Sequence, residues 1–245
     1  MQQRLPSLLE RPIAFGHRGA RAHARENTLD SFALALTLGA TGLESDVWLT
    51  ADGIPVLDHD GVVKVGRRRR AVPGLRREQL PGHVPELTDL FIRCGTDYHL
   101  SLDLKHVESA RPVVDLVRAV APDLRPRLWL CHSDVGALVA LREYAPDVRL
   151  VNSTRLDRMK EGPERRAAAL AAAGIDAVNL HRSDWNGGLT ALFHRFERVA
   201  FGWDLQFDHQ LRPALRMGLD GVYSDHVDTM VDAFKAELGA IPSEL

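Results

Sequence analysis

The chain lacks most of what marks a secreted, membrane-spanning or nucleic-acid-binding protein. Its 245 residues include only two cysteines, Cys94 and Cys131, which is too few for a disulfide framework. No apolar run approaches the length that crosses a bilayer, and residues 1–12 lack the apolar core of a signal peptide. The formal net charge of −2 gives no bias toward nucleic acid or an anionic membrane. We expect a cytoplasmic protein that binds no nucleic acid and is not stably inserted in a membrane, and the sequence leaves its oligomeric state open.

One local exception to this even charge is the arginine run 67–70, which is followed by Arg76 and Arg77. Such a run can attract phosphate, but a solvated loop is the more common reason for it. We therefore expect a solvated loop in this part of the chain.

Short β-like runs alternate with amphipathic helical stretches from one end of the chain to the other. The predicted strands are 13–18, 42–50, 98–105, 127–132, 148–153, 177–181, 199–205 and 221–224. The helices that follow them are predicted to begin near Thr28, Leu87, Glu108, Asp134, Pro163, Gly188, His209 and His226. Eight βα units with strongly apolar strands favour an α/β fold of the (β/α)₈ or TIM-barrel type, in a single domain spanning 1–245. A doubly wound sheet is disfavoured because no GxGxxG motif follows the first strand.

Short polar residues at helix starts predict how several helices are capped. We predict Asn27 as the N-cap of the first helix and Ser133 or Asp134 as that of the fourth. The last helix is expected to be capped by Ser224 or Asp225.

One connection, from the second strand to the second helix, is longer than the others. Asp52-Gly53 lies between two apolar runs, and this pattern predicts a tight turn that folds a hairpin off the second strand. The hairpin would place His59 over one end of the barrel. The insertion is expected to span about 51–84, and its part from 61 to 84 to be a loop that helps to cover the same mouth.

Ionisable residues gather near the ends of the predicted strands, where the active sites of such barrels lie. Glu44 and Asp46 are on the second strand, and Asp103 and Lys105 end the third. Because side chains alternate along a strand, the members of each pair share a face. Unpaired carboxylates are costly inside a barrel, so a cation should neutralise them. Since no Cys or His lies at metal-ligand spacing, the all-oxygen set of Glu44, Asp46 and Asp103 suits Mg²⁺ or Ca²⁺ rather than Zn²⁺.

The alternative is a structural ion network in which these acids pair with Lys105 and Arg18. Two histidines favour a catalytic site instead, because His17 and His59 flank the acidic pair from opposite sides. Groups that titrate near neutral pH beside a metal can perform the acid/base catalysis of a displacement. The positive charge of the ion, Arg18 and Lys105 should attract an oxyanion, and a phosphate ester fits best.

Six motifs, in this order, resemble those of the glycerophosphodiester phosphodiesterase family. They are HRG at 17–19, ENT at 26–28, GLESDVWLTADGIPVLDHD at 42–60, VPELTDL at 84–90, SLDLK at 101–105 and DGVYSD at 220–225. The resemblance spans nearly the whole chain and is strongest before Lys105. It implies a TIM barrel and a metal-dependent phosphodiesterase that hydrolyses small-molecule glycerophosphodiesters to glycerol 3-phosphate and an alcohol.

The resemblance also implies roles for eight residues. They are an acid/base pair, His17 and His59; ligands of the phosphate and the substrate, Arg18, Lys105 and Trp203; and ligands of a divalent ion, Mg²⁺ or Ca²⁺, namely Glu44, Asp46 and Asp103. The nucleophile would be either water or the adjacent glycerol hydroxyl, and the sequence does not assign acid and base to particular histidines.

The sequence departs from the family pattern at three places. Asp103 stands where glutamate is common, which shortens the reach of this carboxylate by one methylene. No proline follows Asp225, and the arginine run replaces the usual residues after the HD motif. These departures leave the choice of ion and of leaving group open.

Two other interpretations remain. One is a lysophospholipase D-like or sphingomyelinase D-like activity on lysolipids, which a long apolar lid or a disulfide-closed loop would favour, and the sequence has neither. The other is a non-catalytic phosphate-binding barrel, which the loss of a histidine or an acid would favour. All of those residues are present.

Overall fold

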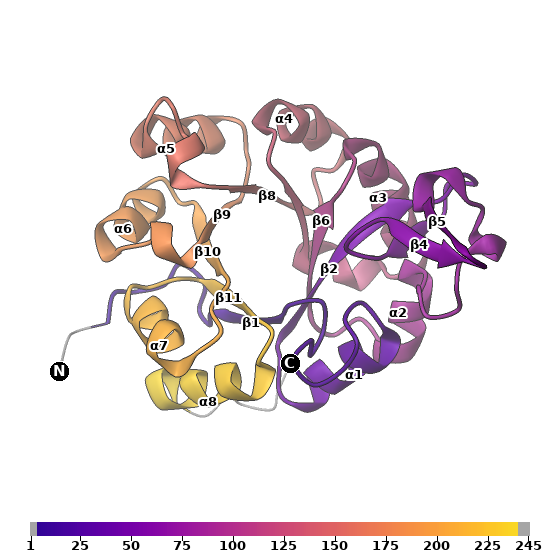
Figure 1. The fold of residues 1–245 in the computed structure, drawn as a ribbon. Coiled ribbons are helices and arrows are strands. Elements are labelled where there is room, and N and C mark those ends of the chain that lie inside the picture. The colour runs from indigo at the N-terminus through magenta and orange to yellow at the C-terminus, as the bar shows by residue number, and fades with distance from the viewer. Residues whose placement is uncertain (1–3, 240–245) are drawn as a thin grey trace.

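Eight parallel strands close into a barrel in the computed structural model, which describes residues 4–239 (Figure 1). The barrel strands are β1 (Ile13–Gly16), β2 (Gly42–Leu49), β6 (His99–Leu104), β7 (Leu128–His132), β8 (Arg149–Thr154), β9 (Ala177–His181), β10 (Val199–Trp203) and β11 (Gly221–Ser224). The barrel is closed because β1 pairs with β11 on one side and with β2 on the other. The predicted TIM barrel is confirmed.

A helix follows each barrel strand, and the helices surround the barrel in Figure 1. They are α1 (Leu29–Thr37), α2 (Leu87–Cys94), α3 (Ala110–Val120), α4 (Val135–Tyr144), α5 (Pro163–Ala172), α6 (Gly187–Arg195), α7 (Asp208–Arg216) and α8 (Val227–Leu238). Short 3₁₀ helices occur at Val72–Gly74, Arg77–Gln79, Val107–Ser109, Pro122–Arg127, Leu156–Arg158 and Arg182–Asp184. No helix within 4–239 is long and apolar enough to cross a membrane.

The first helix is capped by a different residue from the one predicted. Thr28 is the N-cap of α1, and its hydroxyl accepts a hydrogen bond from the backbone N–H of Ser31. The prediction of Asn27 was wrong because this side chain points into the protein. Its Oδ1 accepts a hydrogen bond from Ser45 at 2.7 Å, and its Nδ2 lies 3.4 Å from Asp46.

Two further N-caps test the same kind of prediction. Asp134 caps α4, since its carboxylate accepts hydrogen bonds from the backbone of Gly136 and Ala137. At α8 the prediction was wrong, because His226 occupies the N-cap position. The Asp225 side chain is engaged elsewhere, near the mouth of the barrel.

The predicted hairpin off the second strand is confirmed. β3 (Pro55–Leu57) pairs antiparallel with β2, and Gly53 in the turn has a φ of +79°. The expected loop from 61 to 84 is different from the prediction. It contains a second antiparallel hairpin, β4 (Val62–Val65) and β5 (Arg68–Ala71).

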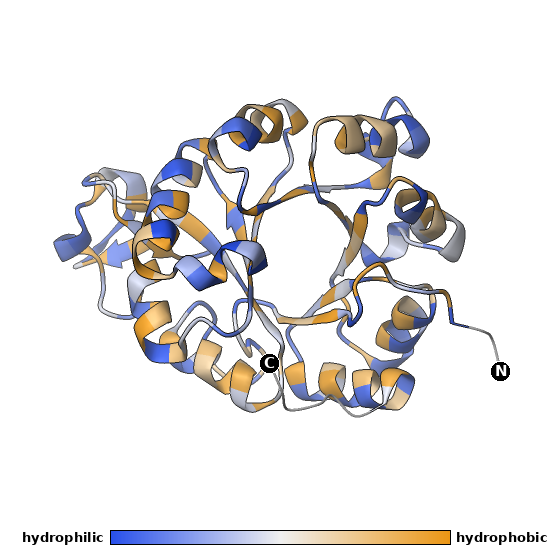
Figure 2. Cartoon of the chain, turned by 180° about the vertical axis from the view of Figure 1, so that it is seen from behind, coloured by the Kyte–Doolittle hydropathy of each residue, from blue (hydrophilic) through white to orange (hydrophobic). Residues whose placement is uncertain are grey.

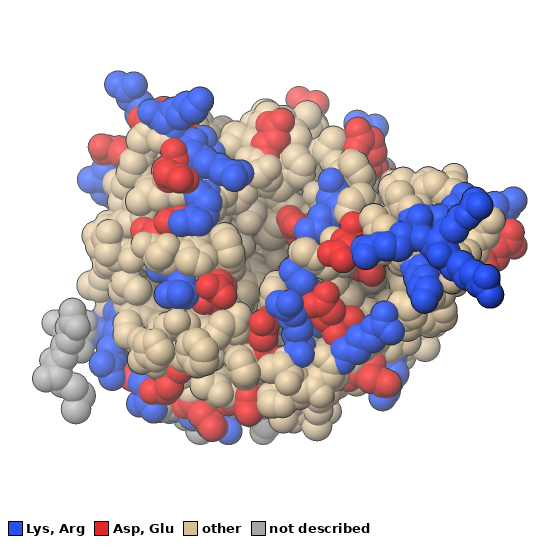
Figure 3. Space-filling model, in the orientation of Figure 1, with Lys and Arg blue, Asp and Glu red and all other residues tan. Residues whose placement is uncertain are grey.

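This second hairpin lies at the side of the barrel in Figure 1, and it does not line the cavity at the mouth. Val63 and Val65 of β4 hold it there, because they pack with Val56 of β3 in a small core separate from that of the barrel. Its arginines are exposed, as expected for a solvated segment, and Figure 3 shows a basic cluster at the right of the molecule that borders the mixed charges around the mouth.

The main core lies between the strands and the helices, and Figure 2 shows hydrophobic residues concentrated along the strands. A second core lies inside the barrel, toward the amino ends of its strands. Its aromatic members are Phe15, Trp129, Phe201 and Tyr223. The rings of Phe15 and Tyr223 stack at a centroid distance of 4.5 Å. This aromatic plug fills the amino-terminal part of the barrel, so the space that remains lies toward the carboxyl ends of the strands.

Candidate active site

A cavity of about 480 Å³ opens at the carboxyl ends of the barrel strands. All eight residues predicted to form the site line it: His17, Arg18, Glu44, Asp46, His59, Asp103, Lys105 and Trp203. They come from widely separated parts of the sequence, and closure of the barrel brings them together.

The register between two neighbouring strands sets the arrangement of the acids. Asp46 on β2 lies directly across from Asp103 on β6. Lys105 lies between them, with its Nζ 2.6 Å from an oxygen of Asp46 and 2.8 Å from an oxygen of Asp103. Burial alone would lower the pKa of Lys105, but the two carboxylates outweigh it and raise that pKa. Lys105 is therefore a fixed positive charge in the cavity.

Arg18, two residues beyond the end of β1, contacts Asp46 and Glu44. Its backbone N–H donates to Glu44 at 2.9 Å, and its Nε lies 3.4 Å from Asp46. Arg18 has a φ of +52°, a conformation that a non-glycine residue seldom adopts. The contacts of Arg18 and Lys105 form the ion network that the sequence left as an alternative to a metal site.

Glu44 is the acid that this network leaves uncompensated. Burial raises the pKa of Glu44 to about 7. Among the described residues, no lysine or arginine side chain reaches its carboxylate, and His17 approaches it only to 3.8 Å. A buried carboxylate without a cationic partner is costly, so a further cation would be stabilised beside it.

The donor set fits a hard divalent cation by its chemistry, because Glu44, Asp46 and Asp103 offer oxygen ligands on adjacent strands. In the structure these three carboxylates do not form a tight group, since Lys105 lies between two of them. Within 4–239, one group of three ligand-type side chains has its ligand atoms within 4.8 Å of one another, and it lies elsewhere.

His17 is oriented by an acid that the sequence analysis had assigned to a helix cap. Its Nδ1 lies 2.5 Å from Asp225, which leaves Nε2 directed toward Glu44. Burial lowers the pKa of His17, but the charge of Glu44 and the hydrogen bond to Asp225 raise it by more. Asp225 ends the DGVYSD motif at a strand end, and that position was the signal that could have identified it.

His59 lines the same cavity from the chain that follows β3. Its Nδ1 lies 2.9 Å from Asp60, so both histidines have a carboxylate at Nδ1. His59 also borders a smaller cavity of about 230 Å³, which the β4 strand helps to line. The second hairpin therefore bears on the surroundings of His59 and does not line the main cavity itself.

The opposite wall of the cavity is polar but less charged. Trp203 packs against His181, with 4.5 Å between the ring centroids, and His181 lies 3.1 Å from Asp204. Asn179 lines the same wall, and its buried Oδ1 has no hydrogen-bond partner within the described part of the chain. Asn179 was not predicted, because a single Asn inside a strand carries no signal of its own.

A model of the glycerophosphoryl diester phosphodiesterase family matches residues 17–229 of the chain. A glycerophosphodiester phosphodiesterase from Bacillus altitudinis is 23% identical over 237 residues, covering 89% of this chain and 96% of that relative. A mouse protein, glycerophosphodiester phosphodiesterase domain-containing protein 4, is 50% identical over 50 residues, which are 20% of this chain. The matched region spans only 8% of the length of the mouse protein.

Solved structures share the fold over the whole barrel. One is a phosphodiesterase from Oleispira antarctica in complex with the product sn-glycerol-3-phosphate, with a TM-score of 0.78. It is 21% identical to this chain, and the match covers 91% of this chain and 97% of that one.

Proposed function

The chain belongs to the glycerophosphoryl diester phosphodiesterase family, whose model matches most of its length, and from this premise we propose that it hydrolyses glycerophosphodiesters to glycerol 3-phosphate and an alcohol. The observation that carries the proposal is one cavity that gathers two histidines, three cationic side chains and five carboxylates. The related Oleispira antarctica structure, which holds sn-glycerol-3-phosphate, supports the choice of product.

Arg18 and Lys105 bind the nonbridging oxygens of the phosphate. Both cations are held at the mouth of the barrel by Asp46, at 3.4 Å and 2.6 Å respectively. Fixed positive charges of this kind stabilise the charge that develops on phosphorus-bound oxygens in the transition state. Glu44, Asp46 and Asp103 would hold Mg²⁺ or Ca²⁺, which when bound supplies Lewis-acid polarisation of the phosphoryl group.

His17 and His59 move the protons. One takes the proton of the nucleophile and the other protonates the leaving alcohol. If the nucleophile is water, glycerol 3-phosphate forms directly; if it is the adjacent glycerol hydroxyl, a cyclic phosphate forms and water then opens it to glycerol 3-phosphate. Asp225 positions His17 through Nδ1 and leaves Nε2 free for the substrate, and it stabilises the protonated ring. Asp60 does the same for His59.

Trp203 and Asn179 position the organic part of the substrate on the opposite wall. The indole offers an apolar surface, and the unpartnered Oδ1 of Asn179 accepts a hydrogen bond from a glycerol hydroxyl. A polar wall of this kind suits a small hydrophilic ligand better than an acyl chain, which favours glycerophosphodiesters over lysolipids.

The test is release of glycerol 3-phosphate from a panel of glycerophosphodiesters by the purified chain. It is run after EDTA and again with Mg²⁺, Ca²⁺ or Mn²⁺ restored, with lysophosphatidylcholine as a parallel substrate. We expect release that depends on the ion. Turnover of the lysolipid alone would establish the lysolipid activity instead, and no turnover by folded protein would establish a non-catalytic barrel.

A further inference from the structure

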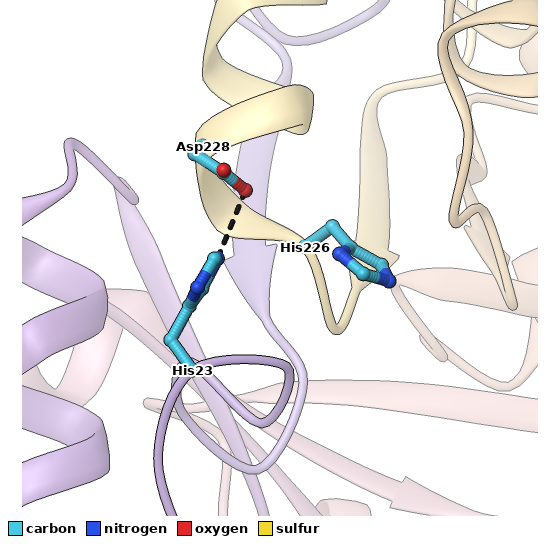
Figure 4. A group of neighbouring side chains, drawn as sticks. All are labelled: His23, His226 and Asp228. Atoms are coloured by element: carbon cyan, nitrogen blue, oxygen red, sulfur yellow. Dashed lines mark hydrogen bonds and ion pairs between the residues drawn. The ribbon is translucent and has the colours of Figure 1, made fainter.

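A group of side chains outside the cavity combines two imidazoles with a carboxylate (Figure 4). His23 comes from the connection between β1 and α1, and His226 and Asp228 lie at the start of α8. The ligand atoms of all three lie within 4.8 Å of one another. Nε2 of His23 is already 3.0 Å from the Asp228 carboxylate, as the dashed line in Figure 4 marks. The sequence does not predict this group, because the two histidines are far apart along the chain and not at metal-ligand spacing.

The backbone holds the three donors in place from both sides. The backbone N–H of Ala22 donates to the carbonyl oxygen of Asp225 at 3.1 Å, which joins the connection after β1 to the end of β11. The backbone N–H of His226 donates to the hydroxyl of Ser224 at 3.1 Å. Asp228 is in the first turn of α8, whose neighbouring residue Val227 is fully buried. Little ordering of the chain is therefore needed when a ligand binds.

We propose that His23, His226 and Asp228 form a second cation site, separate from the carboxylates of the cavity, for a borderline transition-metal ion such as Zn²⁺. Two imidazoles and one carboxylate are a ligand set typical of Zn²⁺, with water in the fourth position. Ligand atoms of a tetrahedral zinc ion are about 3.3 Å apart, from metal–ligand distances of about 2.0–2.1 Å. The separation of His23 and Asp228 fits this value, and a rotation of the His226 side chain completes the set.

The ligand chemistry separates this site from the cavity. Imidazole nitrogen favours Zn²⁺, whereas an all-oxygen set favours Mg²⁺ or Ca²⁺. The start of a helix carries a partial positive charge, so Asp228 supplies the negative charge that a cation needs at the N-terminus of α8. Bound there, the ion ties the connection after β1 to α8, beside the Arg21–Asp225 ion pair at the mouth.

The test measures zinc binding to tag-free protein by equilibrium dialysis at neutral pH, with Mg²⁺ in large excess. The variants are His23→Gln, His226→Gln and Asp228→Asn, and His209→Gln is the matched control because His209 is an exposed histidine outside the group. We expect one zinc ion per chain in the wild type and in the control. Each of the three variants should weaken zinc binding at least tenfold, roughly the loss that removing even an outer-shell partner of a metal can cause.

A variant in the cavity distinguishes the two cation sites. A Glu44→Gln/Asp46→Asn variant keeps the histidine group intact, so it should still bind zinc, and zinc should raise its Tm as it raises that of the wild type. The Tm of His23→Gln should not respond. The proposal is wrong if no zinc binds, if the three variants keep the wild-type affinity, if His209→Gln loses as much as they do, or if zinc binding is lost with Glu44 and Asp46.

Discussion

The barrel interior has an aromatic end and a charged end, and the same strands supply both. Phe15 of β1 belongs to the aromatic plug, and His17, two residues further on, lines the cavity. On β11, Tyr223 stacks in the plug and Asp225 contacts His17. A step of two residues along a strand returns to the same face, so the inward-facing rows of β1 and β11 pass from apolar to ionisable.

The two ends of the barrel interior differ in what holds them together. The plug fills the amino-terminal part of the barrel, and at the charged end burial raises the pKa of Glu44 to about 7. The charged end has little packing of its own and depends on ion pairs such as Lys105 with Asp46. Changes at the charged end should therefore remove catalysis and leave the fold intact, whereas changes at the aromatic end should do the reverse.

The largest expected effect is on catalysis. We expect His17→Ala and His59→Ala each to lower kcat by about 10²–10⁴-fold, the range for loss of a general acid or base. The Tm of both variants should stay near that of the wild type, because neither ring belongs to the core. His132→Ala is the control, because that imidazole lies outside the cavity, where its Nδ1 accepts a hydrogen bond from the backbone N–H of Asp134. Near-normal rates in both variants would refute the acid/base pair.

The next effect separates positioning from proton transfer. Asp225→Asn keeps the shape of the side chain and removes the charge that orients His17. We expect kcat to fall by less than in His17→Ala while KM changes little, because Asp225 acts through the histidine. Steady-state kinetics with a glycerophosphodiester measures both constants. A rise in KM with kcat unchanged would instead assign Asp225 to ground-state binding of the substrate.

The aromatic end offers the matching change in stability. A Cβ on Gly42 would lie 2.5 Å from the ring of Phe15, so Gly42→Ala forces the plug to move. We expect a loss of about 1–3 kcal/mol in the free energy of unfolding, as for overpacked cores, with kcat of the folded fraction largely kept. Gly82→Ala is the control, since a Cβ there meets nothing within 4 Å. Urea unfolding measures both variants, and equal stability of the two would contradict the close contact at Gly42.

The sequence predicted the features that depend on local pattern. The barrel strands could be predicted because each is an apolar run within a short stretch of sequence. The first hairpin could be predicted because its turn at Gly53 is equally local. Features set by distant partners could not be predicted. Asn27 and Thr28 are both good N-caps, and only the position of Ser45 on a neighbouring strand draws Asn27 inward. The second hairpin likewise packs on a small core to which Val56 of β3 belongs.

The site divides in the same way. The family resemblance predicted the eight cavity residues, and most of them lie at or near a strand end, where the fold directs side chains to one place. The roles of these residues remain predictions. Other contacts depend on which strand ends become neighbours when the barrel closes, and no short stretch of sequence contains that information. They are the contacts of Asp225, of Asn179 and of His23 with His226.

The smallest expected effect is a pH dependence at the aromatic end. Burial lowers the pKa of His99 to about 4, and Nδ1 of its neutral ring accepts a hydrogen bond from the Trp129 indole. In the unfolded chain the pKa of this histidine is near 6.5, so as the pH falls the unfolded chain takes up the proton before the folded protein does. The contribution of the neutral His99 ring to the free energy of unfolding is therefore complete above pH 6.5 and is lost as the pH falls toward 4. His99→Asn keeps an acceptor and does not titrate.

The quantity to measure is the difference in unfolding free energy between the wild type and His99→Asn, from urea titrations between about pH 7 and pH 4. The difference is needed because Glu44 acts in the opposite direction. Its pKa of about 7 in the folded protein lies above the ordinary 4.5, so its contribution is present at low pH and is lost as the pH rises through 7. We expect the wild type to lose stability relative to the variant as the pH falls. A difference that does not change with pH would show that His99 does not couple acid to the aromatic end.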